Sequence, residues 1–276
     1  MTIFQSNTIL THDNLMLNLR QYGNIPDSSK AVIITHGYGE HQGYYCDFAD
    51  FLSEKGFMVF TYDLRSHGLS EGRRGDVADF RFFLDDLKII FEYVRNLTQG
   101  KEIFMFGHSL GGSIVLNFIL RFPELKIQKA VISSPWLRLA FDPPFYKLAL
   151  AKLGKILFPS LVIKGELNIS DLSRDIDFVK KFKEDPLTYD KISSRYYFSI
   201  KNAGLFVLNN ASGLIQPVLI SHGDDDKVTS YEASKKFCDQ SGAEFKSWDG
   251  GYRHVVFSEN DKRDIFTYFY RYLAGV

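Results

Sequence analysis

The segment that most constrains the fold is residues 102–116, where an apolar strand, a serine turn and an apolar helix follow one another directly. The strand pattern ends at Phe106, and the turn has the form Gly107-x-Ser109-x-Gly111. This order is the context of a nucleophile elbow, which holds a strained serine at the edge of a sheet. Glycines are needed on both sides of the serine because strand and helix pass too closely there for side chains. The segment predicts a nucleophilic serine in an α/β fold.

Composition and charge exclude several classes of protein. The 276 residues are enough to bury a full core. Lys plus Arg and Asp plus Glu each number 33, and this balance argues against a nucleic-acid partner, which usually requires a basic excess. The two cysteines, Cys46 and Cys238, do not make a disulfide framework and fit a reducing compartment such as the cytoplasm. No signal-peptide pattern precedes Asn18, and no run reaches the roughly 18 apolar residues of a spanning helix.

Strand and helix patterns alternate along most of the chain, which predicts a parallel sheet with helices on both faces. An antiparallel hairpin at 2–22 comes first, followed by a loop at 24–29. Strands are predicted at 31–35, 57–62, 102–106, 130–134, 217–222 and 244–248, the first two of them as strands buried on both faces. Helices are predicted at 45–54, 79–96, after the elbow, 231–240 and 259–273. From Pro135 to Leu208 the alternation stops and the pattern looks helical. The interpretation is an α/β core at 1–134 and 209–276, with an insertion at 135–208 that returns to the core.

A serine nucleophile needs a base, which an acid orients, and on this type of fold the acid precedes the histidine in the chain. The only histidines after the elbow are His222 and His254. His222 ends a strand and is interpreted as structural, whereas His254 lies in a glycine-containing loop after the last strand, where the base is expected. The acid should follow the strand at 217–222, and spacing leaves the choice among three aspartates open, two of them expected in a solvated turn: Asp224, Asp225 and Asp226.

The negative charge that develops on a carbonyl oxygen requires two backbone N–H donors. One is predicted at Leu110, the residue after the nucleophile. The other is predicted at Tyr38, in the glycine-containing loop that follows the first parallel strand. His36 and Glu40 of the same loop are interpreted as hydrogen-bonding residues that shape it. No metal and no organic cofactor is implied.

Several motifs occur in an order that is typical of one enzyme family. They are His36–His41, Asp63–Gly72, Gly107–Gly112, Leu172–Asp175, Lys183–Tyr189, His222–Val228 and Gly251–His254. With them, the chain resembles the monoacylglycerol lipase and lysophospholipase family of α/β-hydrolases, within the serine aminopeptidase S33-like hydrolases, from about Ala31 to Leu273. The resemblance implies an α/β-hydrolase fold with a mostly parallel central sheet and a helical cap inserted after the sixth strand. It also implies that Asp226 is the acid of a triad with Ser109 and His254.

The sequence departs from that family at two positions. Ser66 stands where the family commonly has glycine, and Tyr44 stands where some members have an arginine near the glycerol end of the site. The second departure concerns the preference for a head group.

The resemblance further implies that the insertion is a lid and that the substrates are small-molecule lipid esters with a single acyl chain. Within the insertion, apolar residues recur at helical spacing, with Lys147, Lys152 and Lys155 between them: Phe145, Ala149, Leu153, Ile156 and Leu157. This pattern suits a helix that lines an acyl pocket or touches a membrane surface, and equally a helix packed on its own domain. Peripheral membrane contact through the cap is therefore a hypothesis.

Two alternatives remain from the sequence. One is another enzyme on the same fold that acts on small non-lipid substrates, such as a general carboxylesterase or a cofactor-free haloperoxidase. The other is a non-catalytic binding protein, and the presence of all three triad residues argues against it.

Overall fold

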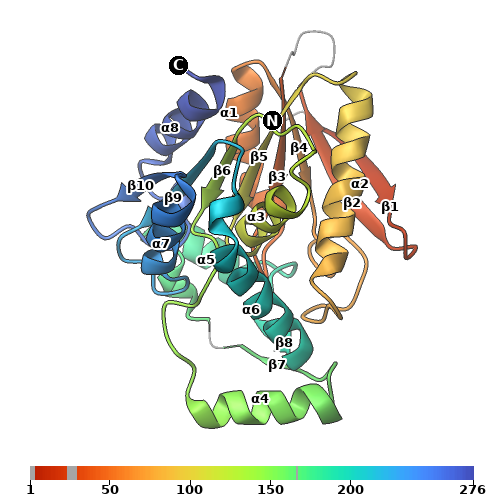
Figure 1. Ribbon diagram of the computed structural model, residues 1–276, viewed down its shortest axis with the longest axis vertical. Helices are drawn as coiled ribbons and strands as arrows, with labels where there is room; N and C mark the ends of the chain where they lie inside the picture. Colours follow the sequence, from red (N-terminus) through yellow and green to blue (C-terminus); the bar gives the residue numbers. More distant parts are fainter. Residues whose placement is uncertain (1–3, 24–29, 166) are drawn as a thin grey trace.

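The centre of the molecule is an eight-stranded sheet in the order β1-β2-β4-β3-β5-β6-β9-β10 (Figure 1). The computed structural model describes residues 4–23, 30–165 and 167–276. The loop expected at 24–29 and the first residues of the expected hairpin lie outside the described residues. Strands β1 (Phe4–Leu10) and β2 (Met16–Tyr22) form the predicted antiparallel hairpin, and β2 is antiparallel to β4.

All other strand pairs in this sheet are parallel, as predicted. These strands are β3 (Lys30–Thr35), β4 (Phe57–Tyr62), β5 (Glu102–His108), β6 (Ala130–Ser133), β9 (Val218–Gly223) and β10 (Glu244–Trp248).

Helices cover both faces of the sheet, which confirms the prediction. One face is covered by α2 (Arg81–Leu97), α3 (Leu110–Arg121), α6 (Ser194–Asn209) and α7 (Tyr231–Ser241), and the other by α1 (Cys46–Glu54) and α8 (Lys262–Ala274). Successive side chains of β3 pack into opposite cores, with Ile33 against the first set of helices and Val32 and Ile34 against the second. The strand therefore reads as a continuous apolar run because both of its faces are buried.

The predicted insertion is less uniformly helical than its sequence suggests. It contains α4 (Phe145–Leu157), the 3-10 turn η2 (Ile169–Asp171), α5 (Ile176–Glu184) and, before α6, a separate two-stranded antiparallel sheet of β7 (Val162–Lys164) and β8 (Lys191–Ser193). The all-helical expectation is wrong here because three residues are too few to show a strand period. Figure 1 shows α4 apart from the sheet, at one end of the molecule.

The last helix of the insertion, α6, packs on α3 of the core. The Asn117 side chain of α3 donates to the backbone oxygens of Ser113 and, at 3.1 Å, of Ala203 in α6. The part of the insertion that stands away from the sheet is α4, whereas Leu172 and Phe182 of the insertion pack with residues of the sheet. Within the described parts of the chain, every helix is too short or too polar to cross a membrane.

Candidate active site

The elbow between β5 and α3 holds Ser109 in a conformation that non-glycine residues rarely adopt. The φ of Ser109 is +51° and its ψ is −114°. The serine is buried, with 5% of its surface exposed. A Cβ on Gly107 would lie 2.6 Å from Gly111 O, and a Cβ on Gly111 would lie 2.1 Å from Thr35 O. Both glycines are therefore required by close packing, the second against the end of β3. The Ser109 N–H donates to Ser133 O at 2.9 Å, which ties the turn to β6.

The structure brings His254 and Asp226 together from loops that are 28 residues apart. His254 Nδ1 lies 2.8 Å from Asp226 Oδ2, and both side chains are buried. Burial alone would raise the pKa of Asp226, but the adjacent His254 and His222 hold it well below its usual range. Asp226 is therefore a carboxylate at neutral pH, and it fixes the His254 proton on Nδ1.

Further donors surround Asp226 and hold it in one orientation. Oδ1 accepts from the backbone N–H groups of Val228 and Thr229, at 2.7 and 3.0 Å, and Oδ2 accepts from the Thr229 hydroxyl at 2.9 Å. His222 Nε2 lies 2.9 Å from the same Oδ2, while His222 Nδ1 lies 2.9 Å from Ser234 Oγ. The sequence interpretation of His222 as structural missed its contact with Asp226, for which the four-residue spacing is the only signal.

The two neighbouring aspartates lie in the turn after β9 and make different contacts. Asp224 accepts three backbone N–H groups, those of Gly250, Gly251 and Tyr252, each at 2.9 Å. It is exposed in the turn after β9, as expected, and it also anchors the loop that carries His254. Asp225 makes a surface ion pair with Lys227 at 3.5 Å. Sequence spacing could not separate the three because the donors to Asp224 come more than twenty residues later.

The loop after β3 passes close to the serine. A Cβ on Gly37 would lie 3.1 Å from Ser109 Cβ. Among the described residues, the backbone N–H groups of Tyr38 and Leu110 have no hydrogen-bond partner. Leu110 is the first residue of α3, where an N–H has no partner within the helix. The structure thus leaves two free main-chain donors on the segments next to Ser109.

The shape of this loop depends on the two residues that the sequence indicated. Glu40 Oε1 accepts from the Gly37 N–H and from the Tyr45 hydroxyl, both at 2.5 Å. His36 donates from Nδ1 to Gly37 O at 2.7 Å and accepts from the Leu64 N–H at Nε2, at 2.9 Å. The interpretation of His36 and Glu40 as hydrogen-bonding residues of the loop is confirmed.

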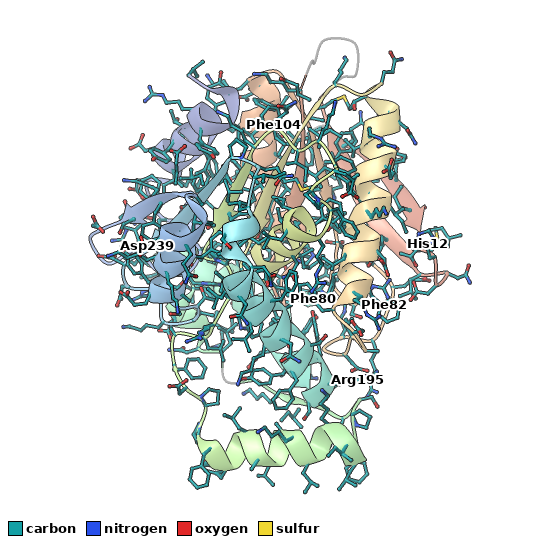
Figure 2. All side chains as sticks on the ribbon, viewed as in Figure 1. His12, Phe80, Phe82, Phe104, Arg195 and Asp239 are labelled. Carbon is teal, nitrogen blue, oxygen red and sulfur yellow. The ribbon has the colours of Figure 1, made fainter. Side chains whose placement is uncertain are left out.

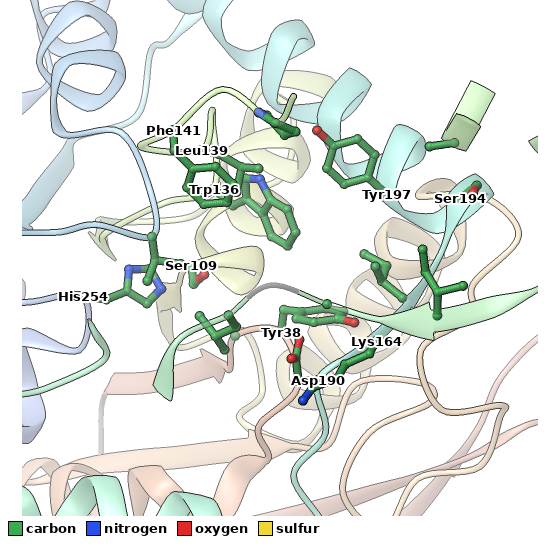
Figure 3. A pocket seen from close by; sticks show the side chains of 18 of the residues that line it. Tyr38, Ser109, Trp136, Leu139, Phe141, Lys164, Asp190, Ser194, Tyr197 and His254 are labelled. Atoms are coloured by element: carbon green, nitrogen blue, oxygen red, sulfur yellow. The ribbon is translucent and has the colours of Figure 1, made fainter. Parts of the chain in front are cut away.

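A cavity of about 600 Å³ reaches Ser109 and His254. Figure 3 shows these two side chains on one side of the cavity, and Lys164, Asp190, Ser194 and Tyr197 on the other. Its apolar walls come from both core and insertion, and include Trp136, Leu139, Phe141, Leu148, Leu150, Ala151, Phe158, Leu161, Ile163, Leu172, Phe182, Ile192, Val228 and Val255. The volume lies within the range of small-molecule sites.

Helix α4 contributes to the cavity with a different face from the one that the sequence indicated. The apolar residues that recur at helical spacing in the sequence are exposed, with Phe145 at 84% and Ile156 at 78%. The cavity is instead lined by the opposite face, including Leu148, Ala151 and Gly154. Figure 2 shows side chains of α4 pointing both toward the body of the molecule and away from it. The helix is apolar on two faces, so its periodicity did not identify the inner one.

The two departures from the family pattern have structural explanations. Ser66 has φ of +68°, a left-handed conformation in which glycine has no steric cost. Tyr44 packs against Phe178 and Phe182 of the insertion and donates to Asp185 at 3.1 Å. Its side chain is therefore engaged by the insertion.

Within the described residues, no group of three or more His, Cys, Asp or Glu side chains could hold a metal ion.

The family described as serine aminopeptidase S33 matches residues 26–261. Monoacylglycerol lipase of Mycolicibacterium smegmatis is 28% identical over 241 residues, which cover 86% of this chain and 85% of that protein. An uncharacterised abhydrolase domain-containing protein of Dictyostelium discoideum is 29% identical over 266 residues, 94% of this chain, and the chain spans only 28% of that protein.

Among solved structures, that of Paleococcus ferrophilus monoacylglycerol lipase is 29% identical with a TM-score of 0.85, over 94% of this chain and 98% of that one. The predicted α/β-hydrolase fold is confirmed by this likeness and by the order of the strands.

Proposed function

The chain belongs to the serine aminopeptidase S33 family of hydrolases, and we propose that it is a serine hydrolase that cleaves carboxylic esters of single-chain lipids, such as monoacylglycerols or lysophospholipids. The observation that carries the proposal is the apolar cavity of about 600 Å³ that opens onto Ser109 and His254. Apolar walls bind an acyl chain without leaving buried polar groups unpaired. A relative of similar length is a monoacylglycerol lipase, which supports the same class of substrate.

The reaction begins at Ser109. Its hydroxyl oxygen attacks the ester carbonyl while His254 Nε2 takes the hydroxyl proton. Asp226 accepts the hydrogen bond from His254 Nδ1, at 2.8 Å, and stabilises the imidazolium that forms. The backbone N–H groups of Tyr38 and Leu110 donate to the developing oxyanion.

The collapse of the tetrahedral intermediate breaks the bond to the leaving alcohol. His254 gives its proton to that alcohol, which departs and leaves an acyl group on Ser109. A water molecule then attacks the acyl carbonyl while His254 takes a proton from it. The second tetrahedral intermediate collapses, the bond to Ser109 Oγ breaks, His254 returns the proton to Ser109, and the fatty acid is released. The positive end of α3, whose N-cap is Ser109, favours the negative charge at this point.

In this proposal the α/β core at 1–134 and 209–276 carries the chemistry, and the insertion at 135–208 covers it. The insertion supplies most of the apolar wall, which supports its role as a cap. Its final helix, α6, is the part that returns to the core.

The outer face of α4 supports the further proposal that the cap makes peripheral contact with a membrane. Phe145, Ile156 and Leu157 are 84%, 78% and 58% exposed. An exposed apolar stripe next to lysines is typical of a helix that lies on an anionic lipid surface. Flotation of the protein with anionic vesicles tests this, and Phe145→Ser with Ile156→Ser should reduce the bound fraction. Equal flotation of both proteins, or none by the wild type, would refute the membrane contact and leave the esterase unaffected.

Labelling with a fluorophosphonate probe tests the nucleophile. Wild type should label, and Ser109→Ala should not. Ser113→Ala is a matched control because Ser113 is a buried serine one turn further along α3, whose hydroxyl has no partner among the described residues. Labelling of Ser109→Ala, or no labelling of wild type, would defeat the enzyme and favour a non-catalytic binding protein.

A series of monoacylglycerols, lysophospholipids and short synthetic esters tests the substrate. The proposal predicts that kcat/KM rises with acyl length because each added methylene buries apolar area in the cavity, at about 0.8 kcal/mol each. A flat series would favour a general carboxylesterase.

A further inference from the structure

The loop that carries His254, residues 249–259 (the histidine loop), begins with two glycines at positive φ. Gly250 and Gly251 have φ of +109° and +84°, and a Cβ on either would meet no atom within 4 Å. The core supports the loop through Asp224, which binds its first amides, and through Ser134 Oγ, which donates to His254 O at 2.8 Å. Nothing in the glycine turn itself fixes where His254 lies, so contacts from other segments decide it.

The insertion supplies a second set of contacts from residues 170–174. The Val255 N–H donates to Leu172 O at 2.7 Å. Arg253 Nη1 donates to Ser170 O and to Ser173 O, at 2.6 and 3.0 Å. This segment overlaps the family-like motif Leu172–Asp175, to which the proposed chemistry assigns no part. Through these bonds the segment holds Arg253 and Val255, the residues on either side of His254.

Arg174 joins the two ends of the histidine loop. Its Nη1 donates to Gly250 O at 2.7 Å, and its Nε donates to Glu259 Oε2 at 3.0 Å. Its guanidinium also lies 4.2 Å from the centre of the Tyr252 ring. The Glu259 side chain is 0% exposed, and a buried carboxylate that loses its cation is strongly destabilised. His254 lies between these two ends, so their separation affects its position.

We propose that Arg174 is a positioning residue for the hydrolysis, which holds His254 in its place beside Asp226 and at the cavity that Ser109 shares by bracing the histidine loop. The inference rests on the proposed function, because it assumes His254 as the base. The insertion then has two parts to play: it lines the cavity, and through Arg174 it completes the support of a core loop. A displacement of the base by about 1 Å is enough to cost on the order of 100-fold in rate.

The test compares Arg174→Ala, Arg174→Lys and a matched control, Arg195→Ala. Arg195 pairs with Asp76 and likewise joins the insertion to a core loop. The two ion pairs are similarly buried: the side chains of Arg195 and Asp76 are 30% and 3% exposed, and those of Arg174 and Glu259 are 36% and 0% exposed. The measured quantities are kcat per site titrated with a fluorophosphonate, KM for a soluble ester, and the midpoint of thermal unfolding. Titration removes misfolded protein from kcat, so a purely structural role would not change it.

Arg174→Ala should lower kcat per titrated site by about 10- to 100-fold with KM changed by less than about threefold. Arg174→Lys should recover part of kcat, since an ammonium can pair with Glu259 but does not reproduce the fork to Gly250. Arg195→Ala should lose a similar amount of stability with kcat within about twofold of wild type.

Two results would overturn the inference: an unchanged kcat per site in Arg174→Ala, or an equal loss of kcat in Arg195→Ala. Failure of the wild type to label would instead refute the proposed function.

Discussion

The serine elbow and helix α4 line the same cavity but are held by different forces. At the elbow, Ser109 is 5% exposed, its N–H is bonded to β6, and Gly111 lies against the backbone at the end of β3. Helix α4 instead exposes half or more of several apolar side chains, such as Leu150 at 65% and Leu153 at 52%. Helix α4 contacts α6 through Lys155, whose ammonium lies 5.7 Å from the centre of the Phe198 ring of α6.

The difference follows from what each wall does. Proton transfer and oxyanion stabilisation require atoms held to within a fraction of an ångström, which needs directional bonds and close packing. An acyl chain has no polar groups to orient, so its wall needs only apolar surface of the right volume. Changes at the elbow side should therefore affect kcat, whereas changes in α4 should affect the choice of substrate.

The largest expected effect tests the elbow side. Asp226→Asn should lower kcat by about 10⁴-fold, because an amide would favour the wrong tautomer of His254 and could not stabilise its cation. Steady-state kinetics with a soluble ester measure this. Asp225→Asn is the control, since its carboxylate pairs with Lys227 at the surface, and it should stay near wild type. A loss of less than about tenfold in Asp226→Asn would mean that this aspartate is not the acid.

The second prediction tests the α4 side. Ala151→Phe should shorten the cavity and lower kcat/KM for long-chain esters by about 10- to 100-fold, with short esters within about twofold. Ala149→Phe is the same substitution on the exposed face of the same helix, and it should leave the whole series unchanged. If both variants shift the series alike, or neither does, α4 does not set the chain-length preference.

The third prediction concerns pH and stability at the core. Because the fold depresses the pKa of Asp226, its carboxylate stabilises the protein fully above the ordinary pKa of about 4. As pH falls below that value the unfolded chain takes up the proton first, and about 2 kcal/mol of stability should be lost. Urea unfolding at several pH values between 7 and 2 measures this, and Asp226→Asn should flatten the dependence. If the difference in free energy of unfolding between wild type and Asp226→Asn stays constant over this pH range, the prediction is contradicted.

The smallest effect concerns backbone strain in the core. Ser66→Gly should raise the free energy of unfolding by about 0.5 kcal/mol, because glycine relieves the left-handed φ but gives up the Ser66 hydroxyl bond to Asp76 O. Asn14→Gly should gain less, since asparagine tolerates its φ of +64°. If the free energy of unfolding of Ser66→Gly rises no more than that of Asn14→Gly, or falls, the serine is not strained. The kcat should be unchanged in both variants.

Much of the core could be predicted from local patterns. Continuous apolar runs mark strands buried on both faces, and the 3.6-residue period marks α2, whose buried side chains include Phe83, Leu87 and Ile90. The position of the elbow was predictable because a strand, a turn and a helix that are adjacent in sequence are adjacent in space. The resemblance to the family then singled out Asp226 among three neighbours that spacing could not separate, and its role as the acid stays a prediction.

What the sequence by itself determined is the set of local features: the strands and helices of the core, the strained turn at Ser109, and the candidate residues. Only the tertiary structure decided which face of α4 meets the cavity, that Asp224 and Arg174 hold the loop of His254, and that His222 contacts Asp226. The reason is physical. Local structure follows from residues within a turn or strand of one another, whereas these contacts join segments that the folding of the whole chain brings together.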